Sequence, residues 1–172
     1  MQKKSVARLV VAAMCLALCL VLPFLTGQIR EIGSMLCPMH LPVLLCGFLC
    51  GWPWGLAVGA VAPLLRSALF SRPPLFPIAV SMAAELAVYG LVTGLLSARL
   101  PKKLGWTYVS LIAAMLLGRV AWGLVRLLLA GLSGGAFTWA MFLSGALTTA
   151  IPGIIVQLIL VPVIVTAVQK RV

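Results

Sequence analysis

Long apolar runs, separated by short stretches rich in proline, glycine and charge, dominate this chain. A helix needs about 20 mainly apolar residues to cross the hydrocarbon core of a bilayer, and most of these runs are that long. None of them alternates strictly between apolar and polar residues, as a barrel strand would. The pattern therefore predicts an all-α membrane protein, a compact bundle of six transmembrane helices over residues 5–25, 40–51, 54–70, 78–97, 105–130 and 137–168.

The breaks between the runs predict the connections. Residues 26–39, 71–77 and 131–136 are expected to form loops on one side, with the prolines of 71–77 favouring a stiff extended turn. The stretches 51–55 and 99–103 are expected to form the turns on the other side. Pro152 and Pro162 predict kinks in the last helix.

Composition agrees with a lipid environment. The chain is 63% hydrophobic and only 9% charged, whereas a soluble domain carries about 25% charged residues. A polar, water-facing surface cannot be built from so few charges. We therefore expect residues 1–172 to form a single transmembrane domain without a large soluble part.

The charge distribution predicts the orientation of the bundle. The net charge is +11, and eight of the thirteen basic residues fall in three clusters: Lys3, Lys4 and Arg8; Arg99, Lys102 and Lys103; Lys170 and Arg171. Six helices would bring all three clusters to one side, which is the positive-inside pattern. We expect both termini in the cytoplasm, the protein in the inner (cytoplasmic) membrane, and no binding of nucleic acid.

The five cysteines do not predict a metal site. They form no CxxC motif and have no histidine at metal-ligand spacing, so we expect them to pack as small apolar residues: Cys15, Cys19, Cys37, Cys46 and Cys50. No small-residue cleavage site follows the first apolar run, which we interpret as a retained helix and not a signal peptide. No cofactor is predicted.

Four charged residues fall inside the predicted helices: Arg66, Glu85, Arg119 and Arg126. Charges within a bilayer are costly and are functional candidates by default. A rise of about 1.5 Å per residue places Glu85 about 12 Å below the outer end of its helix and Arg126 about 6 Å below the outer end of its own. All four are expected in the outer half of the bundle.

Aromatic and hydroxyl side chains accompany these charges. Trp122 lies on the same helical stripe as the two arginines that flank it, and Tyr89 lies one turn after Glu85. Thr148, Thr149 and His40 are expected at a similar depth. This set suits a pocket for a small polar ligand with a flat or carboxylated part. Alternatively, Glu85 only pairs with an arginine to hold two helices together, and His40 is an interfacial residue.

Catalysis finds no support in the sequence. It contains no HExxH, GxSxG or Walker A motif, and its two acids, Glu31 and Glu85, are far apart. We expect a protein that is not an enzyme, and any ATP-driven step would need a partner.

Several segments together resemble the S components of energy-coupling factor (ECF) transporters, over almost the whole length. The resemblance rests on residues 12–17 (AAMCLA), 39–47 (MHLPVLLCG), 51–56 (GWPWGL), 73–77 (PPLFP) and 82–90 (MAAELAVYG). S components are small six-helix membrane proteins that bind a vitamin or similar micronutrient.

The resemblance implies a mechanism and partners. Ala13 and Ala17 match the family's AxxxA pattern, which docks on a transmembrane T subunit, and two cytoplasmic ATPases supply the energy. The S component would bind its substrate outside, topple in the membrane and release it inside. Pantothenate, riboflavin and a queuosine-type deazapurine all remain candidate substrates. The alternatives are a non-transporting scaffold of the cell-shape type and a self-sufficient secondary transporter.

Overall fold

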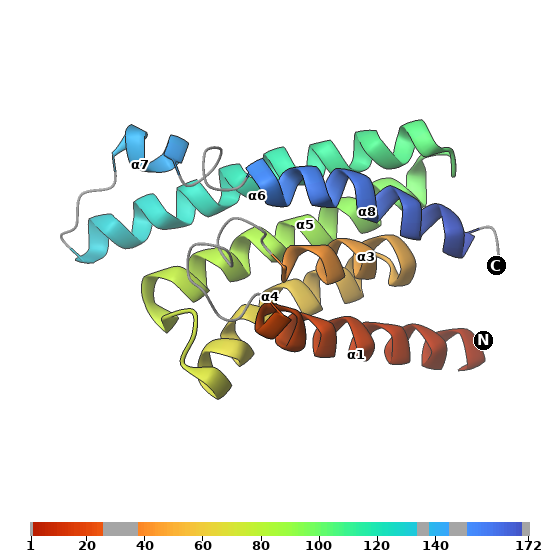
Figure 1. The fold of residues 1–172 in the computed structure, drawn as a ribbon, viewed down its shortest axis with the longest axis horizontal. Coiled ribbons are helices and arrows are strands. Elements are labelled where there is room, and N and C mark those ends of the chain that lie inside the picture. Colours follow the sequence, from red (N-terminus) through yellow and green to blue (C-terminus); the bar gives the residue numbers. More distant parts are fainter. Residues whose placement is uncertain (1, 26–37, 134–137, 145–150, 170–172) are drawn as a thin grey trace.

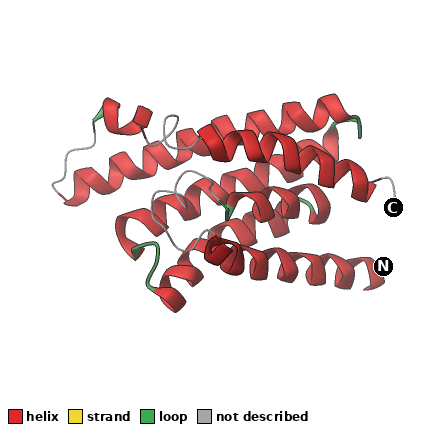
Figure 2. Ribbon diagram, viewed as in Figure 1, coloured by secondary structure: helices red, strands yellow, loops and turns green. Residues whose placement is uncertain are grey.

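The computed structural model describes residues 2–25, 38–133, 138–144 and 151–169. All regular secondary structure within these ranges is helical (Figure 2). The elements are α1 (Gln2–Leu25), α3 (His40–Cys50), α4 (Trp52–Phe70), the wide turn η1 (Leu75–Ala79), α5 (Val80–Arg99), α6 (Leu104–Ser133), α7 (Trp139–Leu143) and α8 (Ile151–Gln169).

The arrangement of the helices centres on α5 (Figure 1). Helices α3 and α4 pack on one side of α5, and α6 packs on another. Helix α1 covers α3 and α4, while α8 contacts α3 and α6. Because α5 touches α3, α4 and α6, its buried side chains are the ones that can meet residues from several helices at once.

Five of the described helical segments are long and apolar enough to cross a membrane: Ser5–Phe24, Trp52–Phe70, Leu75–Arg99, Leu104–Leu132 and Ile151–Val168. The apolar helix α3 is shorter. Large apolar side chains also point outward along the bundle, as on α6, where Leu116 and Leu128 are more than 60% exposed. These faces suit contact with lipid.

The predicted helices agree with the observed ones up to residue 130. The expected single helix over 137–168 is wrong, because the structure has two separate helices there, α7 and α8. Apolar composition continues through this region, and composition alone cannot show where a helix stops. Residues 145–150 lie outside the described part. Pro162 lies inside α8, and its carbonyl accepts a hydrogen bond from the Thr166 hydroxyl at 2.7 Å.

Glycines let α3, α4 and α5 approach at backbone distance. A Cβ added at Gly90 of α5 would collide with the backbone of Gly55 on α4, and one added at Gly59 would collide with the backbone of Leu86. Gly51, with φ +93°, makes the turn from α3 into α4 in a conformation that other residues rarely adopt. This close packing fixes α4 against α5, the helix that carries the buried Glu85.

The connection between α4 and α5 is only partly extended. Ser71 ends α4 in the left-handed region with φ 55°, and Phe76 is extended with φ −116° and ψ 134°. The chain then closes a wide turn in which the Ala79 amide donates to the Pro74 carbonyl at 3.0 Å. The expected stiff extended turn is therefore limited to the first part of this segment.

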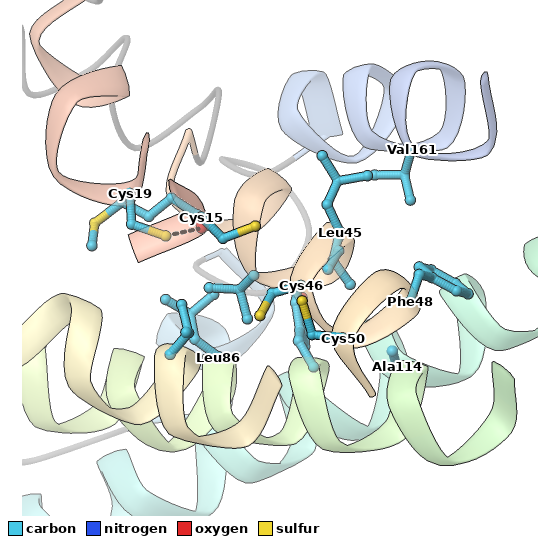
Figure 3. Close-up of a cluster of buried hydrophobic side chains, with 14 of the residues drawn as sticks. Cys15, Cys19, Leu45, Cys46, Phe48, Cys50, Leu86, Ala114 and Val161 are labelled. Atoms are coloured by element: carbon cyan, nitrogen blue, oxygen red, sulfur yellow. Dashed lines mark hydrogen bonds between the residues drawn. The ribbon is translucent and has the colours of Figure 1, made fainter. Parts of the chain in front are cut away.

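The cysteines of α1 and α3 lie in the hydrophobic core (Figure 3). Cys15, Cys19, Cys46 and Cys50 are buried and carry free thiols, and the Cys19 thiol donates to the Met39 carbonyl at 3.5 Å. These four pack as the sequence predicts. Cys37 lies outside the described residues.

The first turn of α1 and the last turn of α8 lie at the same end of the bundle (Figure 1). The connection from α5 to α6, which carries Lys102 and Lys103, lies at that end too. The segments that carry the first two basic clusters therefore lie at one end of the described bundle, and Lys170 and Arg171 lie outside the described residues.

Candidate functional site

The Glu85 carboxylate is the centre of a buried polar cluster. Glu85 lies on α5 and is 1% exposed. Its Oε1 atom is 2.9 Å from Nη1 of Arg119 on α6 and 3.4 Å from Nε2 of His40 on α3. One carboxylate thus joins three helices, and its negative charge lies between a guanidinium and an imidazole. We name the group formed by His40, Glu85, Tyr89 and Arg119 the Glu85 cluster.

Tyr89 completes this cluster one helical turn after Glu85. It is 1% exposed, and its phenol interacts with the Glu85 carboxylate. Its ring meets the His40 ring edge to face, with centroids 5.2 Å apart at 68°. The ring also packs against Gly118 of α6, where any added Cβ would collide with it. The missing side chain at Gly118 lets α6 approach α5, so that Arg119 reaches Glu85.

A second cluster lies further along α6 and includes α7. The Arg126 guanidinium carbon lies 5.8 Å from the centroid of the Trp122 ring, within the range of a cation–π contact. The Trp122 and Phe142 rings lie 6.1 Å apart and are tilted by 31°. Phe142 also packs on Gly123, where an added Cβ would collide with its ring. We name Trp122, Arg126 and Phe142 the Trp122 cluster.

The predicted stripe on α6 is therefore present. Arg119 reaches one cluster, and Trp122 and Arg126 form the next, all on the face of α6 turned toward the protein. The Nε atoms of both arginines are buried. The two clusters are neighbours along α6, because Trp122 and Arg126 follow Arg119 by three and seven residues.

Arg66 does not join either cluster. It is 4% exposed and lies between α1 and α4, where its guanidinium donates to the Leu20 carbonyl. The Phe24 and Phe70 ring centroids lie 4.9 Å and 5.4 Å from its guanidinium carbon. The depth expected for Arg66 does not determine which neighbour it faces, and here it faces α1.

Other predicted site residues have separate positions. Thr148 and Thr149 lie outside the described residues. Ala13 and Ala17 are exposed on the outer face of α1, one turn apart, between the buried residues Ala12, Cys15 and Cys19. Both side chains are therefore exposed at the surface of the described bundle.

Sequence reasoning missed Phe142 and two of the glycines of α6, Gly118 and Gly123. Phe142 stood inside a helix that was expected to continue, so nothing marked it as part of a short separate helix. The glycines gave a usable signal, because Gly118 and Gly123 each lie next to a residue of the arginine and tryptophan stripe. Small residues in a membrane helix mark places of close approach.

Comparison with protein families decides the identity of the chain. The family described as "ECF transporter, substrate-specific component" matches residues 7–165. The chain belongs to this family. No match was found among curated proteins or among solved structures.

As an ECF S component, the protein is a substrate-binding subunit of a transporter and not an enzyme. Its several apolar helices agree with a multi-pass membrane protein. Family membership implies in general a small-molecule substrate, a T subunit and ATPase partners. The resemblance noted in the sequence is confirmed.

Proposed function

We propose that this S component binds a vitamin or similar micronutrient with high affinity in an outward-facing pocket formed by the Glu85 and Trp122 clusters. Pantothenate, riboflavin and a queuosine-type deazapurine are candidates. The observation that carries this proposal is the convergence of His40, Glu85 and Arg119 from three helices in a chain with so few charges. A purely structural ion pair needs two partners, whereas this cluster combines an imidazole, a carboxylate, a guanidinium and a phenol.

The proposed orientation places six helices across the inner membrane, with both termini in the cytoplasm. The shared end of α1 and the α5–α6 connection supports this, since two of the three basic clusters of the sequence belong to these segments. The Glu85 and Trp122 clusters would then open toward the outside.

The substrate is released after the protein docks on the T subunit, and two ATPases supply the energy for this transport. Ala13 and Ala17 form the proposed contact, since small exposed residues allow close approach of another helix. Toppling of the whole bundle would carry the bound substrate to the inside. The Glu85–Arg119 ion pair alone would also suit a non-transporting scaffold, but a scaffold would carry no micronutrient through purification.

The test is mass spectrometry of small molecules that remain bound through purification in mild detergent. Wild-type protein should carry one defined micronutrient, and calorimetry with that compound should show weaker binding by Glu85→Ala and Arg126→Ala, by about tenfold or more. Both variants should still insert into the membrane. The exposed Arg72 lies outside the two clusters, so Arg72→Ala is the control and should bind normally. Equal binding by all four proteins would contradict the proposal.

A further inference from the structure

The carboxylate of Glu85 already has close partners within the protein. Its Oε1 atom lies 2.9 Å from the Arg119 guanidinium and 3.4 Å from the His40 imidazole, and the side chain is almost fully buried. A cationic substrate would have to displace these partners to reach it. Glu85 is therefore poorly suited to be the counter-ion of a substrate and well suited to orient Arg119.

The charged residues outside the three basic clusters are mostly positive. Removing those eight from the thirteen basic residues leaves five, and all five are arginines: Arg30, Arg66, Arg72, Arg119 and Arg126. The chain has only two acids, Glu31 and Glu85. The residues outside the three basic clusters therefore carry a formal excess of three positive charges. Even if each acid pairs with one arginine, the excess remains. Arginine offers a planar, two-pronged donor that fits carboxylate or phosphate oxygens better than lysine does.

The Trp122 cluster adds flat surfaces beside one of these arginines. Arg126 lies over the Trp122 ring, and Phe142 of α7 faces the same indole. A guanidinium beside an indole, which in turn faces a phenyl ring, can hold the anionic group and the flat part of one small molecule at the same time.

From these observations we infer that the substrate is an anion, a small molecule with a carboxylate or phosphate group next to a flat or apolar part. Arg126 binds the anionic group, Trp122 and Phe142 contact the flat part, and Glu85 acts as a positioning residue that holds Arg119. This inference rests on the proposed function and deepens it, because it selects pantothenate-like chemistry over a cationic deazapurine.

The charge preference of the site can be measured without knowing the substrate. Trp122 fluorescence is quenched with iodide, caesium or acrylamide in a non-ionic detergent at constant ionic strength, and the signal of Trp122→Phe is subtracted. A positive site concentrates anions, so iodide should quench the Trp122 component at least about threefold better than caesium. Arg126→Gln should lower this ratio about threefold, and Arg126→Lys, which keeps the charge, should preserve it.

The matched control is Arg72→Gln, which removes the same charge from an exposed position outside the clusters and should leave the ratio unchanged. The inference is overturned if caesium quenches Trp122 as well as iodide does, if Arg126→Gln has no effect on the ratio, or if none of the three quenchers reaches Trp122.

Failure of this inference and failure of the proposed function give different results. A neutral or cationic micronutrient that remains bound through purification would refute the anion preference and leave the binding function intact. An iodide preference that depends on Arg126, together with no substrate uptake in vesicles containing T subunit and ATPases, would refute the transport function and leave the anion site intact.

Discussion

At the scale of single residues, the Glu85 cluster is where the chain departs most from the composition around it. The Glu85 side chain is only 1% exposed inside an apolar bundle. Its carboxylate is stabilised there by the Arg119 guanidinium at 2.9 Å and the His40 imidazole at 3.4 Å. Removing one member leaves the others buried without their partner, and an unmatched buried charge is costly.

This dependence predicts the stability of two variants. Glu85→Gln should reduce the free energy of unfolding by about 3 to 5 kcal/mol, because the Arg119 charge then lacks its carboxylate. Arg119→Gln should cost a similar amount for the reciprocal reason. The double variant should lose clearly less than the sum of the two, since neither buried charge remains unmatched. Thermal unfolding in detergent measures all three, and strictly additive losses would show that the pair is not energetically coupled.

The sequence predicted which residues carry charge inside the helices, but it predicted their neighbours only in part. Helical spacing correctly placed Arg119, Trp122 and Arg126 on one face of α6, and Tyr89 after Glu85. It could not show that Arg66 faces α1, because depth along a helix is readable from spacing whereas the identity of the facing helix depends on packing. Helical spacing alone does not distinguish an arginine that meets a carboxylate from one that meets two phenyl rings.

At the scale of elements, glycine contacts determine how α4 and α5 fit together. Gly55 and Gly59 on α4 oppose Gly90 and Leu86 on α5 at backbone distance. Without a hydrophobic driving force between helices in lipid, such close van der Waals packing is what stabilises the pair.

Substitution at one of these glycines should therefore disrupt the fold. Gly90→Leu forces a side chain into the Gly55 backbone, and we expect a loss of at least about 1 to 3 kcal/mol of stability, or no folded protein. Gly105→Leu is the matched control, since nothing lies within 4 Å of an added Cβ there. Size-exclusion profiles and unfolding midpoints of the two variants provide the measurement. Equal unfolding midpoints would mean that the close α4–α5 contact does not determine the stability of the protein.

The elements themselves were largely predictable from the sequence. The helices up to residue 130 agree with the apolar runs, because a membrane span must be long and almost free of charge. The last run was misjudged for the same reason: Trp139–Leu143 and Ile151–Gln169 are both apolar, so composition shows no boundary between α7 and α8. Without that boundary, Phe142 could not be recognised as a residue that faces Trp122.

At the scale of the whole molecule, α1 presents small residues on an outer face. Ala13 and Ala17 are exposed, whereas Ala12, Cys15 and Cys19 on the same helix are buried. The helix thus packs on the bundle with one side and leaves the other side to lipid or to a partner.

A bulky residue on that face should block assembly and spare substrate binding. We expect Ala13→Trp to lose copurification with the T subunit, because an indole prevents close approach of another helix. Leu116→Trp places the same side chain on the exposed face of α6 and should assemble normally. Substrate binding by both variants should match wild type. Normal copurification of Ala13→Trp would remove this face from the docking contact.

The proposed orientation is also testable on the intact protein. With both termini in the cytoplasm, reporter fusions to either end should be active only for a cytoplasmic reporter, and a cysteine introduced at Arg72 should react with an impermeant thiol reagent from outside. If a reporter fused to either terminus were active only outside the cell, the proposed cytoplasmic location of that terminus would be wrong.

The shortness of α3 has an electrostatic consequence. Its 11 residues span only about 16 Å, roughly half of the hydrocarbon thickness, so His40 begins the helix at a depth where other helices continue. The positive pole of the α3 macrodipole therefore lies at His40, whose imidazole is 3.4 Å from the Glu85 carboxylate in the buried part of the bundle. A short helix thus brings a fixed partial positive charge to the buried Glu85 cluster without placing another ionised side chain there.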